Sequence, residues 1–114
     1  MALAFSWLSS DFATAPQLSA EDITQAAAAG FRSVINNRPD FEGGPAQPTA
    51  AAIEQAAAAA GLEYAFLPVQ SAYQTPDEIA RMRDLLVQLP KPILAFCRSG
   101  ARTSNLFYAA RALG

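Results

Sequence analysis

The chain has 114 residues, with 8 lysines and arginines against 10 aspartates and glutamates, and a formal net charge of −2. This length predicts one domain with a single core, and the nearly balanced charge argues against a nucleic-acid partner or an acidic membrane surface. One cysteine and no histidine exclude an internal disulfide and argue against a transition-metal site, so we expect no metal, no cofactor and a cytoplasmic location.

The N-terminal third predicts two strands, a helix and a third strand. Residues 5–8 and 12–15 are short apolar strand candidates. The apolar run at 3–8 is too short to span a membrane and lacks the basic flank of a signal peptide. Residues 19–30 predict a helix that begins at a serine cap and ends at a glycine, and residues 31–36 follow as a strand.

The remainder continues the alternation of helix and strand. Three prolines and two glycines make residues 38–48 a loop. An alanine-rich helix is expected at 49–60 and a strand at 62–69. A capping box and a proline in the first turn predict a helix at 75–89, whose apolar stripe indicates core packing. Residues 93–97 are the last strand, and the last helix begins inside the loop that follows.

This alternation predicts an α/β fold. We expect a single domain over residues 1–114, with a mostly parallel, four- to five-stranded central sheet flanked by helices. The role of residues 1–11 stays open. Because ligands gather at the carboxyl ends of parallel strands, the loops 38–44, 70–75 and 97–103 are expected to converge on one face.

The 97–103 loop carries the residues with the clearest chemistry. A lone cysteine that closes an apolar strand is usually an inert core residue. Here two arginines, a serine and a glycine follow it at the start of a helix, an environment that lowers a thiol pKa and cradles an anion. Cys97 is therefore the candidate nucleophile and Arg102 the candidate bidentate clamp. The expected anion-binding residues of the loop are Arg98, Ser99, Gly100, Ala101 and Thr103.

The segment 97–104 reads Cys-Arg-Ser-Gly-Ala-Arg-Thr-Ser and resembles the active loops of two enzyme groups. Dual-specificity phosphatases place a glycine three residues and an arginine six residues after the cysteine. Gly100 fits that pattern, whereas Arg102 comes five residues after Cys97. Rhodanese-type sulfurtransferases use a loop one residue shorter, often Cys-Arg-Ser-Gly-x-Arg, and this form matches residue for residue.

Five stretches together resemble the phosphatase-like domain of the bacterial beta-lactamase hydrolase-like proteins. They are 30–40, 47–48, 61–64, 67–69 and 94–102. The resemblance covers about residues 12–114 and implies the fold of dual-specificity phosphatases. Members of this family are described both as phosphatases and as sulfur transferases. The resemblance also implies a sulfide-oxidising or metallo-hydrolase partner.

In a phosphatase reaction, Cys97 would attack phosphorus while Arg102 and the loop N–H groups hold the oxygens of a small anionic substrate. Dual-specificity phosphatases keep an aspartate as general acid just after a strand like 67–69, where this sequence has Gln70, Ser71 and Tyr73. Asp77 belongs to a helix start, so Asp40 is the candidate acid, with a turn-forming role as the alternative. Arg38 is a candidate second anion clamp.

Two further functions stay open. Sulfur transfer through a Cys97 persulfide requires less help from an acid, and the shorter loop favours it. The other is a catalytically silent module that binds an anion or a partner. The fold and the family resemblance favour the phosphatase-like hydrolase.

Overall fold

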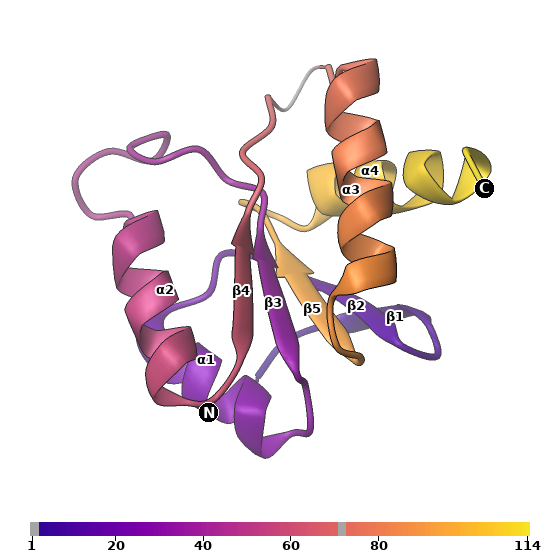
Figure 1. Ribbon diagram of the computed structural model, residues 1–114. Helices are drawn as coiled ribbons and strands as arrows, with labels where there is room; N and C mark the ends of the chain where they lie inside the picture. Colours follow the sequence, from indigo (N-terminus) through magenta and orange to yellow (C-terminus); the bar gives the residue numbers. More distant parts are fainter. Residues whose placement is uncertain (1–2, 71–72) are drawn as a thin grey trace.

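The computed structural model describes residues 3–70 and 73–114, which form one sheet with helices on both faces (Figure 1). The strands are β1 (Ser6–Ser9), β2 (Phe12–Ala15), β3 (Ser33–Asn36), β4 (Glu63–Phe66) and β5 (Ile93–Phe96). The helices are α1 (Ala20–Ala28), α2 (Ala50–Ala59), α3 (Pro76–Gln88) and α4 (Ala101–Ala112). The strand order is β1-β2-β5-β3-β4, with β1 antiparallel to β2 and the other pairs parallel. The predicted α/β fold with a mostly parallel sheet is confirmed.

Side-chain caps begin three of the helices. Ser19 accepts a hydrogen bond from the Asp22 backbone N–H, and the Asp22 carboxylate accepts one from the Ser19 N–H. Thr75 and Glu78 form the same reciprocal pair at the start of α3. Thr49 caps α2 from its side chain. Each cap satisfies backbone donors that the first turn of a helix leaves free, which is why these helices start where the sequence predicts.

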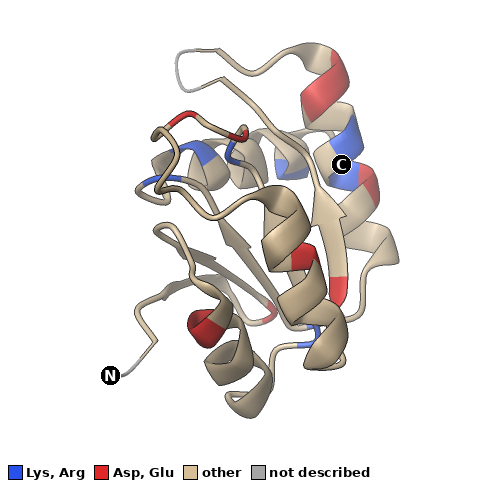
Figure 2. Cartoon of the chain, turned by 90° about the vertical axis from the view of Figure 1, so that its left-hand side faces the viewer, with Lys and Arg blue, Asp and Glu red and all other residues tan. Residues whose placement is uncertain are grey.

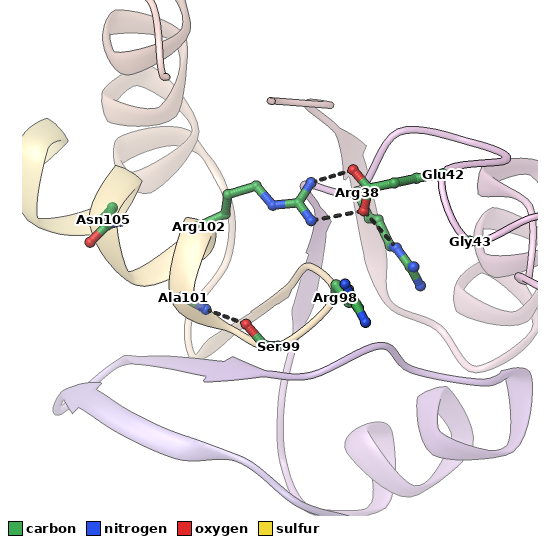
Figure 3. Close-up of a pocket in the computed structure, with 8 residues that line it drawn as sticks. All are labelled: Arg38, Glu42, Gly43, Arg98, Ser99, Ala101, Arg102 and Asn105. Atoms are coloured by element: carbon green, nitrogen blue, oxygen red, sulfur yellow. Dashed lines mark hydrogen bonds and ion pairs between the residues drawn. The ribbon is translucent and has the colours of Figure 1, made fainter. Parts of the chain in front are cut away.

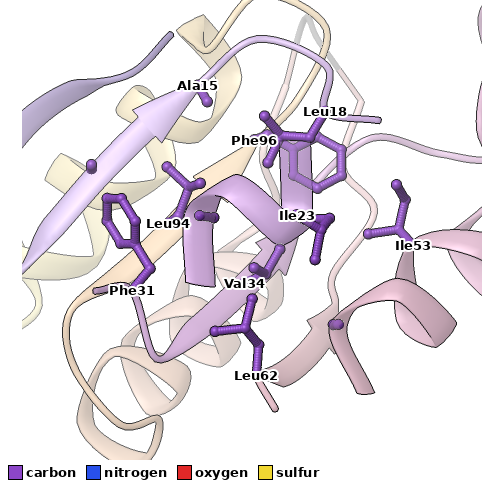
Figure 4. Close-up of a cluster of buried hydrophobic side chains, with 12 residues drawn as sticks. Ala15, Leu18, Ile23, Phe31, Val34, Ile53, Leu62, Leu94 and Phe96 are labelled. Carbon is purple, nitrogen blue, oxygen red and sulfur yellow. The ribbon is translucent and has the colours of Figure 1, made fainter. Parts of the chain in front are cut away.

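The two faces of the sheet carry separate apolar clusters. Helices α1 and α2 cover one face and α3 and α4 the other (Figure 1). Ile23 of α1 and Ile53 of α2 pack with Val34, Leu94 and Phe96 in the first cluster (Figure 4). The second cluster contains Phe12, Ile35, Leu67, Val69, Met82, Ile93, Ala95, Leu106, Phe107 and Ala110. Burial on both sides explains why the central strands are apolar without alternation.

Strand β4 is shorter than the sequence suggests. The prediction covered residues 62–69, whereas the strand ends at Phe66. Leu67 and Val69 still donate backbone hydrogen bonds to the residues at the end of β3. The regular ladder stops because the Arg38 N–H, which would continue it, donates to Asn36 Oδ1 at 2.9 Å, and the Leu67 carbonyl accepts from Asn37 Nδ2 instead.

The loops after β3 and β5 meet at the carboxyl edge of the sheet, as predicted. Asn37, which follows β3, donates its backbone N–H to the carbonyl of Phe96 at the end of β5. Figure 2 shows basic segments gathered at this end of the molecule, with acidic positions on the loop above them. The third loop, 70–75, includes Ser71 and Ala72, which lie outside the described residues. Within the described ranges, no helix is long and apolar enough to cross a membrane.

Candidate active site

The Cys97 loop joins β5 to α4 by a tight turn around the thiol. The backbone N–H of Gly100 donates to Cys97 Sγ at 3.1 Å. Gly100 has φ +97°, a left-handed conformation that a side chain would strain. A Cβ built there would also lie 3.2 Å from Thr14 Oγ1, whose hydroxyl donates to the Gly100 carbonyl at 3.1 Å. Because Gly100 has no side chain, Thr14 of β2 can approach the loop and hydrogen-bond to its backbone.

The loop stabilises Cys97 as a thiolate. Burial raises the pKa of the thiol, but hydrogen bonds from the Thr103 backbone, the Thr103 hydroxyl and the N–H groups of Gly100 and Ser99 outweigh it. The net effect is a pKa below the ordinary thiol value. Backbone dipoles and a hydroxyl thus supply the stabilisation that the sequence also attributed to arginine.

Thr103 links the thiol to the end of β3. Its hydroxyl donates to Asn37 Oδ1 at 2.9 Å, and Asn37 Nδ2 donates to the Leu67 carbonyl at 2.9 Å. The second bond fixes the orientation of the amide, so Oδ1 is an acceptor. One hydroxyl proton can serve either Asn37 or the Cys97 thiolate, whereas the Thr103 backbone N–H is available to the sulfur in both cases.

A pocket of about 760 Å³ opens beside the loop (Figure 3). Its lining is mainly polar and consists of Arg38, Glu42, Gly43, Arg98, Ser99, Ala101, Arg102 and Asn105. Cys97 is 1% exposed and is not one of these residues. The Cys97 residue is therefore almost completely covered by neighbouring atoms. Gly100 and Thr103 are likewise buried in the loop.

Arg102 is held by a carboxylate that the sequence analysis did not single out. Its Nη1 and Nη2 donate to Glu42 Oε2 and Oε1, both at 2.8 Å, and Nη1 also donates to the Val69 carbonyl at 3.1 Å. The Arg102 hydrogen bond lowers the pKa of Glu42 most strongly, burial opposes it, and Arg38 lowers it further. Glu42 is thus an ionised partner and a poor proton donor. The sequence offered one indication of this contact, since Glu42 lies in the 38–44 loop that was expected to converge with the Cys97 loop.

Arg38 lines the pocket, and two of its three side-chain nitrogens are engaged by hydrogen bonds. Its Nε donates to Glu42 Oε1 at 3.0 Å and its Nη1 to Gln17 Oε1 at 3.0 Å. Glu42 therefore bridges Arg38 and Arg102. The side chain of Arg98 is exposed and lines the pocket.

The Asp40 side chain faces α2 and does not line the pocket. Its Oδ1 accepts a hydrogen bond from the backbone N–H of Ala50, the first residue of α2, at 2.7 Å. It is not among the residues that line the pocket. The general-acid role predicted for Asp40 has no geometric support here, because its carboxylate anchors the loop to α2. Among the described pocket-lining residues, Glu42 is the one carboxylic acid.

The described residues offer no group of three His, Cys, Asp or Glu side chains that could hold a metal ion. The pocket is lined by arginines and by the first turn of α4, and the buried, hydrogen-bonded Cys97 thiol lies in the loop beside it. Such a set of groups binds oxyanions and presents a nucleophile to them.

The family of the chain follows from its sequence. Residues 4–114 match the family described as beta-lactamase hydrolase-like protein, phosphatase-like domain. The chain belongs to this family. A beta-lactamase hydrolase-like protein of Agrobacterium fabrum is 36% identical over 92 residues, which are 81% of this chain and 21% of that protein. The chain thus spans about a fifth of the length of this curated relative.

Solved structures show the same fold. A candidate phosphatase from Neisseria meningitidis has a TM-score of 0.85 and 34% identity, over 93% of this chain and 75% of that one. The core catalytic domain of a PP-IP phosphatase from S. cerevisiae has a TM-score of 0.72 and 16% identity, over 96% of this chain and 65% of that one. At that identity the second likeness concerns the fold alone. The fold is that of dual-specificity and tyrosine phosphatases, as the sequence resemblance implied.

Proposed function

We propose that this domain is a cysteine-based hydrolase of phosphate esters, with Cys97 as the nucleophile. The observation that carries the proposal is the buried thiol, which accepts the Gly100 N–H at the N-terminus of α4 beside a basic pocket. In the first step the thiolate forms a bond to phosphorus and the ester P–O bond breaks. Water then cleaves the P–S bond, which releases phosphate and restores the thiol.

The test is hydrolysis of an aryl phosphate by the wild type and Cys97→Ser. We expect phosphate release by the wild type and none by the variant, because a serine hydroxyl is not ionised at neutral pH. Mass spectrometry of rapidly quenched enzyme should show a phosphoryl group on Cys97. Equal turnover by the variant would refute the proposed nucleophile.

Rhodanese-type sulfur transfer is the second candidate, and one observation favours it. Among the described residues that line the pocket, none is a carboxylic acid poised to donate a proton, since the lowered pKa of Glu42 keeps it ionised. In this reaction the Cys97 thiolate attacks the outer sulfur of thiosulfate, the S–S bond breaks and sulfite leaves with the electron pair. A thiol acceptor then attacks the outer sulfur of the persulfide as its thiolate, the S–S bond to Cys97 breaks, and the Cys97 thiolate leaves with the electron pair. Sulfite is a stable leaving group and requires no acid.

Intact-protein mass spectrometry after thiosulfate treatment separates the two reactions. One added sulfur on Cys97, without aryl phosphate hydrolysis, would establish sulfur transfer. Hydrolysis without the sulfur adduct would establish the phosphatase. Failure of both assays in a folded sample would leave an anion-binding module. We retain a small anionic substrate, a sulfide-oxidising or metallo-hydrolase partner and a cytoplasmic setting as parts of the proposal.

A further inference from the structure

The hydrogen bonds of Arg102 leave one edge of its guanidinium available. Glu42 takes one N–H from each Nη atom, and the Val69 carbonyl takes the second N–H of Nη1. Two N–H groups are then left, that of Nε and the second one of Nη2. They lie side by side on the same edge and form a planar two-pronged donor. Within the described part of the chain, neither has an acceptor.

Glu42 is itself held from the opposite side. Arg38 donates to Glu42 Oε1, and Gln17 accepts from Arg38 Nη1. Gly43 makes room for this arrangement, because a Cβ there would lie 2.6 Å from Arg38 Nη2. The carboxylate is thus shared between two guanidinium groups, and both of its oxygens are occupied. This fixes its position better than a single ion pair would.

The backbone before Glu42 is strained. Phe41 has φ +64°, the left-handed region that a bulky residue rarely adopts, and its side chain is 70% exposed. Burial of the ring does not compensate for this conformation. The turn is closed by the Gly44 N–H, which donates to the Phe41 carbonyl at 3.0 Å, and Glu42 faces Arg102 from within this turn.

We propose that Glu42 is a positioning residue that holds Arg102 so that its Nε–Nη2 edge receives two oxygens of the bound anion. This inference rests on the proposed function in one respect, that the substrate is an oxyanion bound at the 97–103 loop. Glu42 itself does not touch the substrate. The alternative role for the same carboxylate is a plug that competes with the anion for Arg102.

The two roles predict opposite effects of Glu42→Gln on anion binding. A glutamine offers one acceptor oxygen and turns an NH₂ group toward the guanidinium, so Arg102 loses its paired contact. For a positioning residue we expect binding of inorganic sulfate, measured by isothermal titration calorimetry, to weaken by about tenfold. Unchanged or tighter sulfate binding would overturn the proposal, and tighter binding would identify a plug.

Glu54→Gln is the matched control, because it removes one negative charge from an exposed position on α2. It should leave sulfate binding within about twofold of the wild type, since surface charges act weakly at physiological ionic strength. A similar loss in both variants would reduce the effect to net charge and refute positioning. Thermal melts of both variants establish that the titrated samples are folded.

A spectroscopic readout separates positioning from general support of the fold. The paired contact slows rotation of the Arg102 guanidinium, so the wild type should give resolved Nη–H signals in nitrogen-edited NMR, which Glu42→Gln should lose. A second variant, Gly43→Ala, displaces Arg38 but keeps every charge. We expect sulfate binding between those of the wild type and Glu42→Gln. Wild-type affinity together with wild-type Nη–H signals in Glu42→Gln would exclude a role for the pair.

Failure of this inference is distinguishable from failure of the proposed function. Sulfate binding requires no chemistry and is measured equally well in Cys97→Ser. If Glu42→Gln weakens sulfate binding in the Cys97→Ser background while the wild type hydrolyses no phosphate ester, the positioning role of Glu42 is supported and the proposed hydrolase activity is refuted. If the wild type is an active hydrolase and Glu42→Gln binds sulfate normally, the proposed hydrolase activity is supported and the positioning role of Glu42 is refuted.

Discussion

Replacement of Asp40 tests whether this carboxylate is an acid or an anchor. Its Oδ1 accepts the backbone N–H of Ala50 at 2.7 Å, from ten residues away in sequence. The Ala50 N–H is one of the donors that the first turn of α2 leaves unpaired, and Thr49 satisfies a different one, that of Ala52. Asp40→Ala would therefore remove a charge-assisted hydrogen bond and leave a part-buried donor without its partner.

The size of the effect follows from this contact. Loss of a side-chain cap costs about 0.5–2 kcal/mol, and a hydrogen bond to a charged group contributes about 1.5–3 kcal/mol. We expect the free energy of unfolding to fall by about 1–2 kcal/mol. At the unfolding entropy typical of a chain of this length, that loss lowers Tm by about 4–8 °C.

The assays are thermal melts and the hydrolysis of an alkyl and an aryl phosphate by the wild type and Asp40→Ala. An anchor lowers Tm and leaves the ratio of the two rates unchanged. Asp77→Ala is the control, because this carboxylate is exposed in the first turn of α3 and should cost less than about 1 kcal/mol. An unchanged Tm, with alkyl hydrolysis slowed at least about a hundredfold more than aryl hydrolysis, would refute the anchor and restore Asp40 as acid.

Three further predictions concern the loop and its partners. The rate of Cys97 alkylation should fall as pH drops through a midpoint below that of an ordinary thiol, and Thr103→Val should move this midpoint upward, because the hydroxyl bond that lowers the pKa is lost; an unmoved midpoint would contradict that role. Gly100→Ala should lower the free energy of unfolding by about 1–2 kcal/mol in urea titrations, since it forces a Cβ into a left-handed position; an unchanged midpoint would contradict the geometry. The pKa of Glu42 is lower in the folded than in the unfolded protein, so its ionised side chain stabilises the fold above the unfolded pKa, and this stabilisation is lost as pH falls through the folded pKa. The Tm of Glu42→Gln should therefore fall less in acid than the Tm of the wild type. Parallel curves of Tm against pH for the two proteins would contradict this linkage.

The sequence was sufficient for those features that local chemistry determines. The capping residues Ser19 and Thr75 fix helix starts within a turn of chain, and the 97–103 loop is continuous, so its turn could be recognised without the fold. The mostly parallel sheet also followed, because short buried strands that alternate with helices pair in parallel. The strand order and the antiparallel β1–β2 pair were not predicted. The error at β4 arose because Leu67 and Val69 stay buried after the strand ends at Phe66, so the apolar pattern continues beyond it.

The sequence was insufficient where a contact depends on how a long loop turns. Asp40 and Glu42 are two residues apart in the same polar segment, and the local sequence does not indicate which of the two carboxylates faces the arginines. Phe41, which lies between them, has a left-handed backbone conformation. This conformation is not one that a phenylalanine favours, so propensity points away from it. The contacts of Glu42 join residues 60 positions apart, which only the folded chain brings together.

The state of Glu42 constrains either reaction of Cys97. A carboxylate shared by two guanidinium groups cannot readily donate a proton, and Asp40 is engaged by α2. Departure of the leaving group then depends on its own stability as an anion. Loss of a general acid costs about two to four orders of magnitude for poor leaving groups. Under the proposed function we therefore expect aryl phosphates and thiosulfate to react faster than alkyl phosphates, because phenolates and sulfite leave without protonation. Both proposed reactions use the same thiolate and the same anion-binding loop, so we expect the anion that reaches Cys97 to decide between phosphorus and sulfur chemistry.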